Sequence, residues 1–344
     1  MEWTVAIGVD THKREHVAVA LDGLGRELGG LRLEASSTGY LRLWEWACEL
    51  GAPAFALEGS GSYGAGLARF LAATEAPLFE CERPARHERR RGKSDPRDAL
   101  LAARRLLAGE EGLSLIRGGG RRESLRVLLV ERRSAEKART DALNQLQSLV
   151  VTAPERLRSR LGAFNDEQLA QAAARVRARR NEGEEAVLVH VLRRLGRRAL
   201  ALGRELDEIE RSLLTLLRVL APDLLAECGV GAFCGAQLVV ASGTPGRMRS
   251  EASFAALAGT NPLDASSGRR QRHRLNRGGD RQLNRALHVI ALTRIRCDEE
   301  TRAYYERLRE RGKTKREAMR CLKRALARHF YRQLQAISEE ALTT

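Results

Sequence analysis

The chain has 344 residues, of which 43% are hydrophobic, and its 60 Lys and Arg residues outnumber its 44 Asp and Glu residues to give a formal net charge of +16. This length allows two or three domains with packed cores, and no apolar run approaches the length of a membrane span. The positive charge indicates a polyanionic partner, most simply nucleic acid. Aromatic residues make up only 4%, so we expect backbone contacts to dominate over base stacking.

Cysteine and histidine usage excludes other classes of protein. The six cysteines are scattered without a Cys-x-x-Cys pair, which is typical of reduced thiols and not of a disulfide framework or a zinc site. The seven histidines show no metal-ligand spacing. The amino terminus lacks the basic stretch of a signal peptide. These features predict a cytoplasmic protein with no membrane partner.

The amino-terminal part alternates between strand-like and helix-like patterns. We expect three antiparallel strands, then a helix, a strand, a helix and a fifth strand, which is the order of a ribonuclease-H-like α/β domain. The expected strands are Thr4–Val9, His16–Leu21, Arg26–Leu33, Ala54–Leu57 and Pro77–Cys81, and the expected helices are Tyr40–Leu50 and Gly64–Ala73.

Four acids occupy positions that this fold would bring together. Asp10 and Glu58 each end an apolar run, at the sheet edge where open α/β folds place their sites. Asp95 and Asp98 are three residues apart and would share one helix face. Four converging carboxylates repel one another unless a cation compensates, and oxygen ligands suit Mg²⁺ or Mn²⁺.

The stretch from Asp95 to Asp98 has a second, purely structural interpretation. Asp-Pro-Xaa-Asp is a good helix start, with Asp95 as N-cap, Pro96 in the first position and Asp98 near the positive end of the helix dipole. The two interpretations are compatible, because a residue that caps a helix can also bind a metal.

Basic residues flank the acids. The stretch 83–93, between the fifth strand and the helix at Asp95, is either a solvated charged loop or a clamp for phosphate. The candidate phosphate-binding residues here are Lys13, Arg89, Arg90, Arg91 and Lys93.

The middle of the chain has helical periodicity. Residues 121–151 and 184–220 each predict one long amphipathic helix, and the two are expected to form an antiparallel, coiled-coil-like pair that serves as a spacer or dimer contact. We therefore expect three domains: 1–110 with the acids, 111–221 with the long helices, and a helical domain at 222–344.

The carboxyl-terminal part contains two further motifs. Short helices around Gly229-Val230-Gly231 resemble a helix-hairpin-helix, whose turn offers backbone N–H groups to phosphate. A small-residue loop with Ser266 and Ser267 then leads into dense arginine, followed by helices at 280–297, 299–311 and 314–340. For the serines alone, an ordinary surface turn is the simpler interpretation. The candidate nucleic-acid-binding residues are Arg269, Arg270, Arg272, Arg274 and Arg277.

Taken together, the motifs resemble bacterial insertion-sequence transposases with a DEDD, RuvC-like nuclease domain, including RNA-guided bridge recombinases. The matching motifs run in family order over nearly the whole chain, and they are Asp10-Thr11-His12-Lys13, Glu58-Gly59-Ser60-Gly61-Ser62-Tyr63, Lys93-Ser94-Asp95-Pro96-Arg97-Asp98-Ala99, the hairpin around Gly229-Val230-Gly231, the loop Ala258-Gly259 to Ser267-Gly268, and Gly278-Gly279-Asp280-Arg281-Gln282-Leu283.

The resemblance implies a bacterial, cytoplasmic enzyme that cuts and rejoins DNA. It implies Mg²⁺ bound by Asp10, Glu58, Asp95 and Asp98, and a nucleophilic serine that forms a phosphoserine link to DNA. Ser267 is favoured because it precedes Gly268, with Ser266 as the alternative. It also implies double-stranded donor and target DNA, a structured noncoding guide RNA, and a dimer or tetramer with sites shared between subunits.

Two other functions fit the same residues. One is a metal-dependent nuclease of the junction-resolvase type, which hydrolyses phosphodiesters with water as nucleophile. The other is a basic, helical nucleic-acid-binding protein without catalytic activity. A covalent protein–DNA adduct separates transposase from resolvase, and metal-dependent cleavage separates both from the binding protein.

Overall fold

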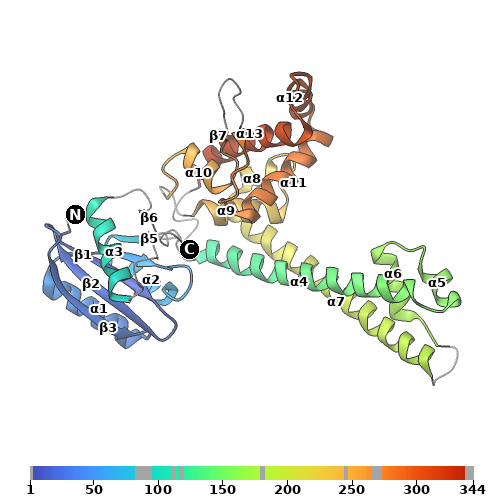
Figure 1. Ribbon diagram of the computed structural model, residues 1–344, viewed down its shortest axis with the longest axis horizontal. Coiled ribbons are helices and arrows are strands. Elements are labelled where there is room, and N and C mark those ends of the chain that lie inside the picture. The colour runs from blue at the N-terminus through green and yellow to red at the C-terminus, as the bar shows by residue number, and fades with distance from the viewer. Residues whose placement is uncertain are drawn as a thin grey trace. The chain divides into compact units, whose positions relative to one another are not determined.

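The computed structural model describes residues 3–81, 95–109, 113–115, 120–178, 183–243, 247–264 and 273–337 (Figure 1). The chain divides into two compact units. Unit 1 consists of Met1–Arg122, Ala241–Gly279 and Ala327–Thr344, and unit 2 of Glu123–Val240 and Asp280–Leu326. The domain boundaries expected from the sequence, at 110 and 221, remain a prediction.

Unit 1 contains a mixed sheet in the strand order β3-β2-β1-β4-β5-β6. Strands β1 to β3 form an antiparallel meander, β4 and β5 run parallel to β1, and the short β6 is antiparallel to β5. Their bounds are β1 Val5–Thr11, β2 Glu15–Asp22, β3 Glu27–Glu34, β4 Pro53–Glu58, β5 Leu78–Cys81 and β6 Leu113–Leu115. The five expected strands are confirmed, and β6 is an additional strand.

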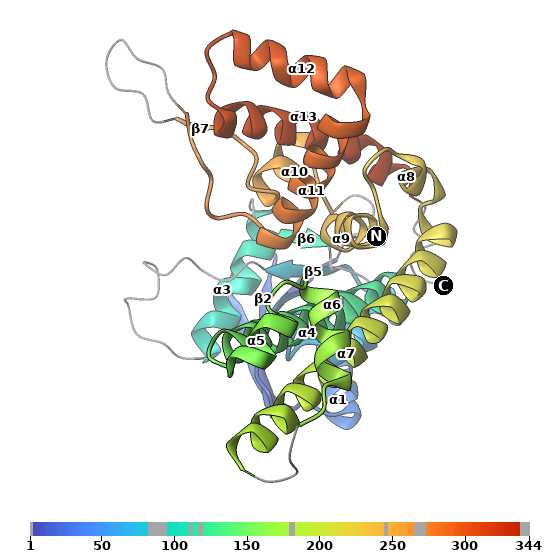
Figure 2. The same cartoon turned by 90° about the vertical axis from the view of Figure 1, so that its right-hand side faces the viewer.

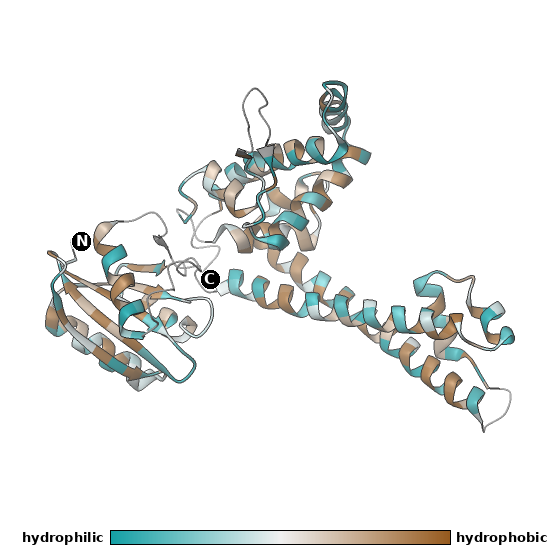
Figure 3. Cartoon of the chain, viewed as in Figure 1, coloured by the Kyte–Doolittle hydropathy of each residue, from teal (hydrophilic) through white to brown (hydrophobic). Residues whose placement is uncertain are grey.

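Helices cover both faces of this sheet. On one face α1 (Ser37–Leu50) and α2 (Ala65–Ala72) share a core with Ile7 and Val9. On the other face α3 (Asp95–Ala108) packs against Ala6 and its neighbours. Because both faces are covered, every residue of β1 is buried, and the central strands read as a continuous apolar run (Figure 3).

The contact of α3 with the sheet is unusually close at Gly8. A Cβ atom at this position would lie 2.0 Å from the carbonyl oxygen of Ala99 and 2.3 Å from the backbone nitrogen of Ala103. The helix presents the small side chains of Ala99, Ala102 and Ala103 to the sheet, and all three are buried. Only glycine in the strand lets the helix backbone come this near.

The middle of the chain is more elaborate than a pair of helices. The two long helices are confirmed as α4 (Gly120–Val151) and α7 (Glu184–Leu220). Two shorter helices, α5 (Glu155–Leu161) and α6 (Asp166–Arg175), lie between them in sequence and contribute to the same hydrophobic core. Figure 2 shows α6 beside the amino-terminal half of α7. Neither short helix was expected from the sequence, although Asn165 and Gln168 form the capping box with which α6 begins.

The remaining chain is largely helical, as expected. Its helices are α8 (Pro222–Ala226), α9 (Ala232–Ser242), α10 (Glu251–Leu257), α11 (Arg281–Cys297), α12 (Glu299–Glu310) and α13 (Lys315–Gln335). A two-residue strand β7 (Leu263–Asp264) pairs with β8 (His273–Arg274). Within the described ranges, no helix combines the length and apolar character needed to cross a membrane.

We predict that Gly8→Ala lowers the free energy of unfolding by about 1–3 kcal/mol or more, because the added methyl group must push α3 off the sheet. Gly61→Ala is the matched control, since a Cβ at Gly61 meets nothing within 4 Å. Denaturant unfolding measures both variants. Equal stability of Gly8→Ala and wild type would contradict the close contact.

Candidate metal centre

Two acids stand side by side at the carboxyl edge of the sheet. The parallel pairing of β1 and β4 places Asp10 opposite Glu58. The hydroxyl of Thr11 donates to the carbonyl oxygen of Glu58 at 2.6 Å, which ties the two strand ends together. The strand register therefore brings these two positions together at one edge of the sheet, and the sharing of a metal ion by their side chains stays a prediction.

Helix α3 brings the other two acids to the same edge. It begins at Asp95, with Asp98 also in its first turn. Ala99 lies one turn after Asp95, and its carbonyl oxygen lies closest to Gly8. Gly8 in turn is two residues before Asp10 and on the same face of β1. The close contact between helix and strand thus sets the approach of Asp95 to Asp10.

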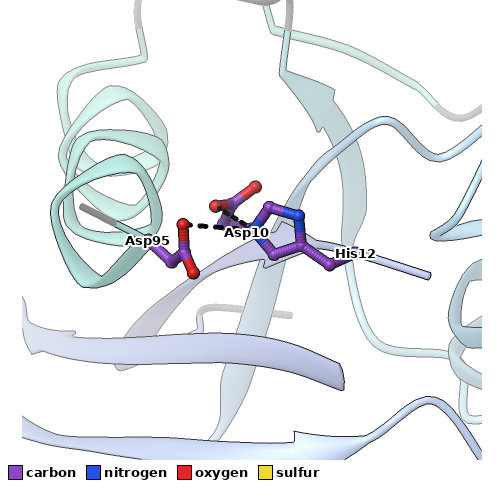
Figure 4. Close-up of side chains that lie close together, drawn as sticks. All are labelled: Asp10, His12 and Asp95. Carbon is purple, nitrogen blue, oxygen red and sulfur yellow. Dashed lines mark hydrogen bonds and ion pairs between the residues drawn. The ribbon is translucent and has the colours of Figure 1, made fainter. Parts of the chain in front are cut away.

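His12 lies between the two aspartates (Figure 4). Its Nε2 atom is 3.1 Å from Oδ2 of Asp10 and 3.2 Å from Oδ1 of Asp95. Ligand atoms of these three residues all lie within 4.8 Å of one another. The histidines show no metal-ligand spacing in the sequence, yet the fold places His12 within reach of both aspartates. The available signal was its position two residues after Asp10, since alternate residues of an extended chain share a face.

Asp10 is the most buried acid of the three-residue group, and the residue is only 6% exposed. Burial raises its pKa above the ordinary 3.8, the neighbouring Asp98 and Asp95 raise it further, and His12 acts in the opposite direction. Burying an acid among acids costs free energy unless a cation is nearby, and the imidazole is the basic group placed to compensate.

His16 supports this arrangement from behind. It is fully buried, and burial lowers its pKa, which keeps the ring neutral. Its Nδ1 atom is 3.3 Å from the backbone nitrogen of His12, which donates to it. The ring also stacks on Tyr40, with ring centroids 5.9 Å apart. The backbone that carries His12 is therefore held by a packed side chain.

The donor set fits a divalent metal ion. Two carboxylates and one imidazole converge here. Both Mg²⁺ and Mn²⁺ bind carboxylate oxygens, and the imidazole nitrogen favours Mn²⁺, the softer of the two ions. Glu58 and Asp98 are outside the three-residue group, although Asp98 is near enough to raise the pKa of Asp10. The arrangement can concentrate a cation at one edge of the sheet.

The remaining candidate residues divide into two groups. Lys13, Arg274 and Arg277 are exposed, with Lys13 one residue from His12. Outside the described residues lie Arg89, Arg90, Arg91, Lys93, Ser266, Ser267, Arg269, Arg270 and Arg272. The serine stretch falls between β7 and β8, which pair with each other.

Comparison with known proteins identifies the family. Residues 7–153 match a DEDD transposase family of the IS110 type, and residues 223–306 match the family described as Transposase IS116/IS110/IS902. The chain belongs to this family of transposases. The matches cover both the sheet that carries the acids and the glycine hairpin, in the order expected from the motifs.

Two insertion-element proteins are similar to the transposase. The uncharacterized 42 kDa protein of insertion element IS900 from Mycobacterium paratuberculosis is 26% identical over 94% of each chain. The uncharacterized 43.6 kDa protein of insertion element IS110 from Streptomyces coelicolor is 38% identical over 101 residues, which are 29% of this chain and 25% of that protein.

We predict that Asp10→Asn leaves the metal-free transposase at least as stable as wild type near neutral pH. An acid whose pKa is raised by folding holds its proton more tightly in the folded state, so wild type loses stability as pH rises from the ordinary 3.8 through the raised pKa. The asparagine variant lacks this loss. Denaturant unfolding in a chelator across this pH range measures the difference.

Asp141→Asn, at an exposed position of α4, is the control and should follow the wild-type pH dependence. An Asp10→Asn variant that is clearly less stable than wild type near neutral pH would show that the buried carboxylate stabilises the fold, against this prediction.

Proposed function

We propose that this transposase cuts and rejoins DNA with a serine nucleophile, Ser267 or the adjacent Ser266, assisted by a divalent metal ion held by the acids at the sheet edge. The observation that carries the proposal is the convergence of Asp10, His12 and Asp95 beside Glu58 in a transposase-family chain. An acid cluster of this kind, partly buried and with a raised pKa, is typical of a functional site.

The metal would be Mg²⁺ or Mn²⁺, bound by Asp10, Glu58, Asp95 and Asp98, with the His12 nitrogen as a further ligand. When bound, such an ion supplies Lewis-acid stabilisation of charge on a phosphoryl oxygen. The protein's own contribution is to hold the acids close together at a cost in stability. The two strand ends tied by Thr11 and the helix resting on Gly8 provide that rigidity.

The strand exchange would conserve phosphodiester bonds. The Ser267 oxygen attacks the scissile phosphorus, the bond to one sugar oxygen breaks, and that oxygen leaves as a hydroxyl with a proton. A second DNA hydroxyl then attacks the phosphoserine, and the serine regains its proton. Two transesterifications need no ATP. A serine hydroxyl requires activation, and neighbouring arginines such as Arg270 and Arg272 would stabilise charge on the phosphate.

The partners of this reaction follow from the family resemblance and the charge. Double-stranded donor and target DNA would be bound through the arginine-rich stretches, consistent with the net charge of +16. A structured noncoding RNA would pair with both DNAs, and a dimer or tetramer would share acid and serine sites between subunits. These partners are part of the proposal.

The acid cluster also fits a junction-resolvase-type nuclease, in which water replaces serine as the nucleophile. The observation that favours this alternative is that the acids form a cluster by themselves, within one sheet and its helix. Only the serine reaction leaves protein covalently attached to DNA.

We predict that Ser267→Ala abolishes strand exchange while binding of DNA and RNA is retained, because the change removes one nucleophilic oxygen and no charge. With a trapped substrate, wild type should yield a DNA-linked peptide that contains Ser266 and Ser267. Ser266→Ala is the matched control and should remain active. An adduct at Ser266 alone would identify Ser266 as the nucleophile. Strand exchange by the double alanine variant would contradict the serine mechanism and leave metal-dependent hydrolysis as the remaining function.

We predict that replacing Arg270 and Arg272 by alanine weakens DNA binding across unrelated sequences. Each lost phosphate contact should reduce the slope of log affinity against log salt by about one. Arg211→Ala, at an exposed position of α7, is the control. A changed sequence preference with an unchanged salt slope would mean that the two arginines read bases instead.

A further inference from the structure

Two exposed thiols that are far apart in sequence meet in unit 2. Cys228 lies in the turn between α8 and α9, and Cys297 is the last residue of α11. Their sulfur atoms are 2.8 Å apart, and both residues are exposed. The scattered cysteine positions did not predict this pair, because only the packing of α11 against the turn brings the two together.

Other contacts hold the two thiols in place. The Nε atom of Arg294, on α11, donates to the carbonyl oxygen of Cys228 at 2.8 Å, and the same guanidinium forms an ion pair with Glu227. The Cys297 thiol lies 3.2 Å from the carbonyl oxygen of Thr293, one turn earlier. The sulfur–sulfur approach is therefore fixed by contacts of the flanking backbone and does not depend on the thiols alone.

The sulfur–sulfur distance of 2.8 Å is already near that of a covalent bond. A disulfide has a sulfur–sulfur distance of about 2.05 Å, so the two atoms must move together by less than ~1 Å. Access is also open, because both residues are exposed, whereas Cys81 and Cys234 are buried.

We propose that Cys228 and Cys297 form an intramolecular disulfide when a low-molecular-weight disulfide such as oxidised glutathione is present. One cysteine thiolate attacks the glutathione disulfide and releases one glutathione thiol. The second cysteine attacks the resulting mixed disulfide and releases the other. The two cysteines are oxidised by two electrons in total, one glutathione disulfide is reduced to two thiols, and the two cysteine protons end on them.

The bond would fix the glycine hairpin on α11. Gly229 follows Cys228 directly and has a φ of 81°, and a Cβ there would lie 3.1 Å from the carbonyl oxygen of Ile290. The hairpin thus already rests on the helix, held by noncovalent contacts. A disulfide would close the loop from 228 to 297 and restrict the unfolded chain, so the oxidised protein should be more stable and its hairpin less able to open.

The pH dependence of the reaction has a defined direction. The contact with Cys297 and burial raise the pKa of the Cys228 thiol. The charge of Arg294 lowers the pKa of this thiol, and the charge of Asp298 raises it. Since the thiolate is the nucleophile, the rate of disulfide formation should increase as pH rises from neutral towards the raised pKa.

The experiment uses the full-length protein in dilute solution with a series of ratios of oxidised to reduced glutathione. Tryptic mapping without reductant should link peptide 219–247 to peptide 297–302, and fragment ions should place the bond at Cys228 and not at Cys234. The oxidised form should show a higher melting temperature by several degrees and slower hydrogen exchange over 227–234. Reduction should reverse both effects.

The control variant, Cys48→Ser with Cys321→Ser, retains the pair and should behave as wild type. Cys228→Ser and Cys297→Ser should each abolish the linked peptides and the change in melting temperature. The proposal is overturned by glutathione attached singly to Cys228 or Cys297 at equilibrium, by links between molecules in place of the internal one, or by full retention of both thiols.

Discussion

The candidate site depends on the contact between a helix and a strand that lacks a side chain. At Gly8 the backbone of α3 lies so near to β1 that a single Cβ would overlap with the carbonyl oxygen of Ala99. Asp95 is one helical turn before that contact on α3, and Asp10 is two residues after it on β1. A bulkier residue at Gly8 would lift the helix and separate the aspartates. The small side chains of α3 therefore have two effects: they pack in the core, and they allow Asp95 to lie near Asp10.

The close approach of α3 to β1 has an unfavourable electrostatic effect, because it brings the acids of α3 near the buried Asp10. Asp10 is buried beside other acids, and its pKa is raised by burial and by Asp98 and Asp95. Proteins keep such arrangements where the surrounding structure is rigid enough to hold them. Here the rigidity comes from paired strand ends, from the packed ring of His16 and from the close helix. His12 reduces the repulsion within the cluster by reaching both aspartates. The folded chain thus holds the ligand atoms of Asp10, His12 and Asp95 within 4.8 Å of one another.

In unit 2, charged side chains form contacts that connect helices. Glu136 on α4 accepts hydrogen bonds from both Arg132 and Arg285, and both guanidinium groups lie over the ring of Phe233, at 4.6 Å and 5.5 Å from its centroid. These contacts join α4, α9 and α11 around the glycine hairpin. Arginines of this kind are engaged in holding helices together. Cys228 belongs to the same turn and its sulfur approaches that of Cys297, so the hairpin is held by ion pairs, aromatic contacts and closely placed thiols.

Local patterns in the sequence determined much of this protein. Apolar runs predicted the five strands, and apolar periodicity placed both long helices within a residue of their observed bounds. The ends of the apolar runs predicted that Asp10 and Glu58 would lie at one edge of the sheet. These features depend on periodicity and connectivity, which neighbouring residues specify. Tertiary structure alone decided the position of His12 between the two aspartates and the meeting of Cys228 with Cys297. Each of these depends on how closely elements pack, because the direction of a side chain in a turn is set by atoms that are distant in the sequence.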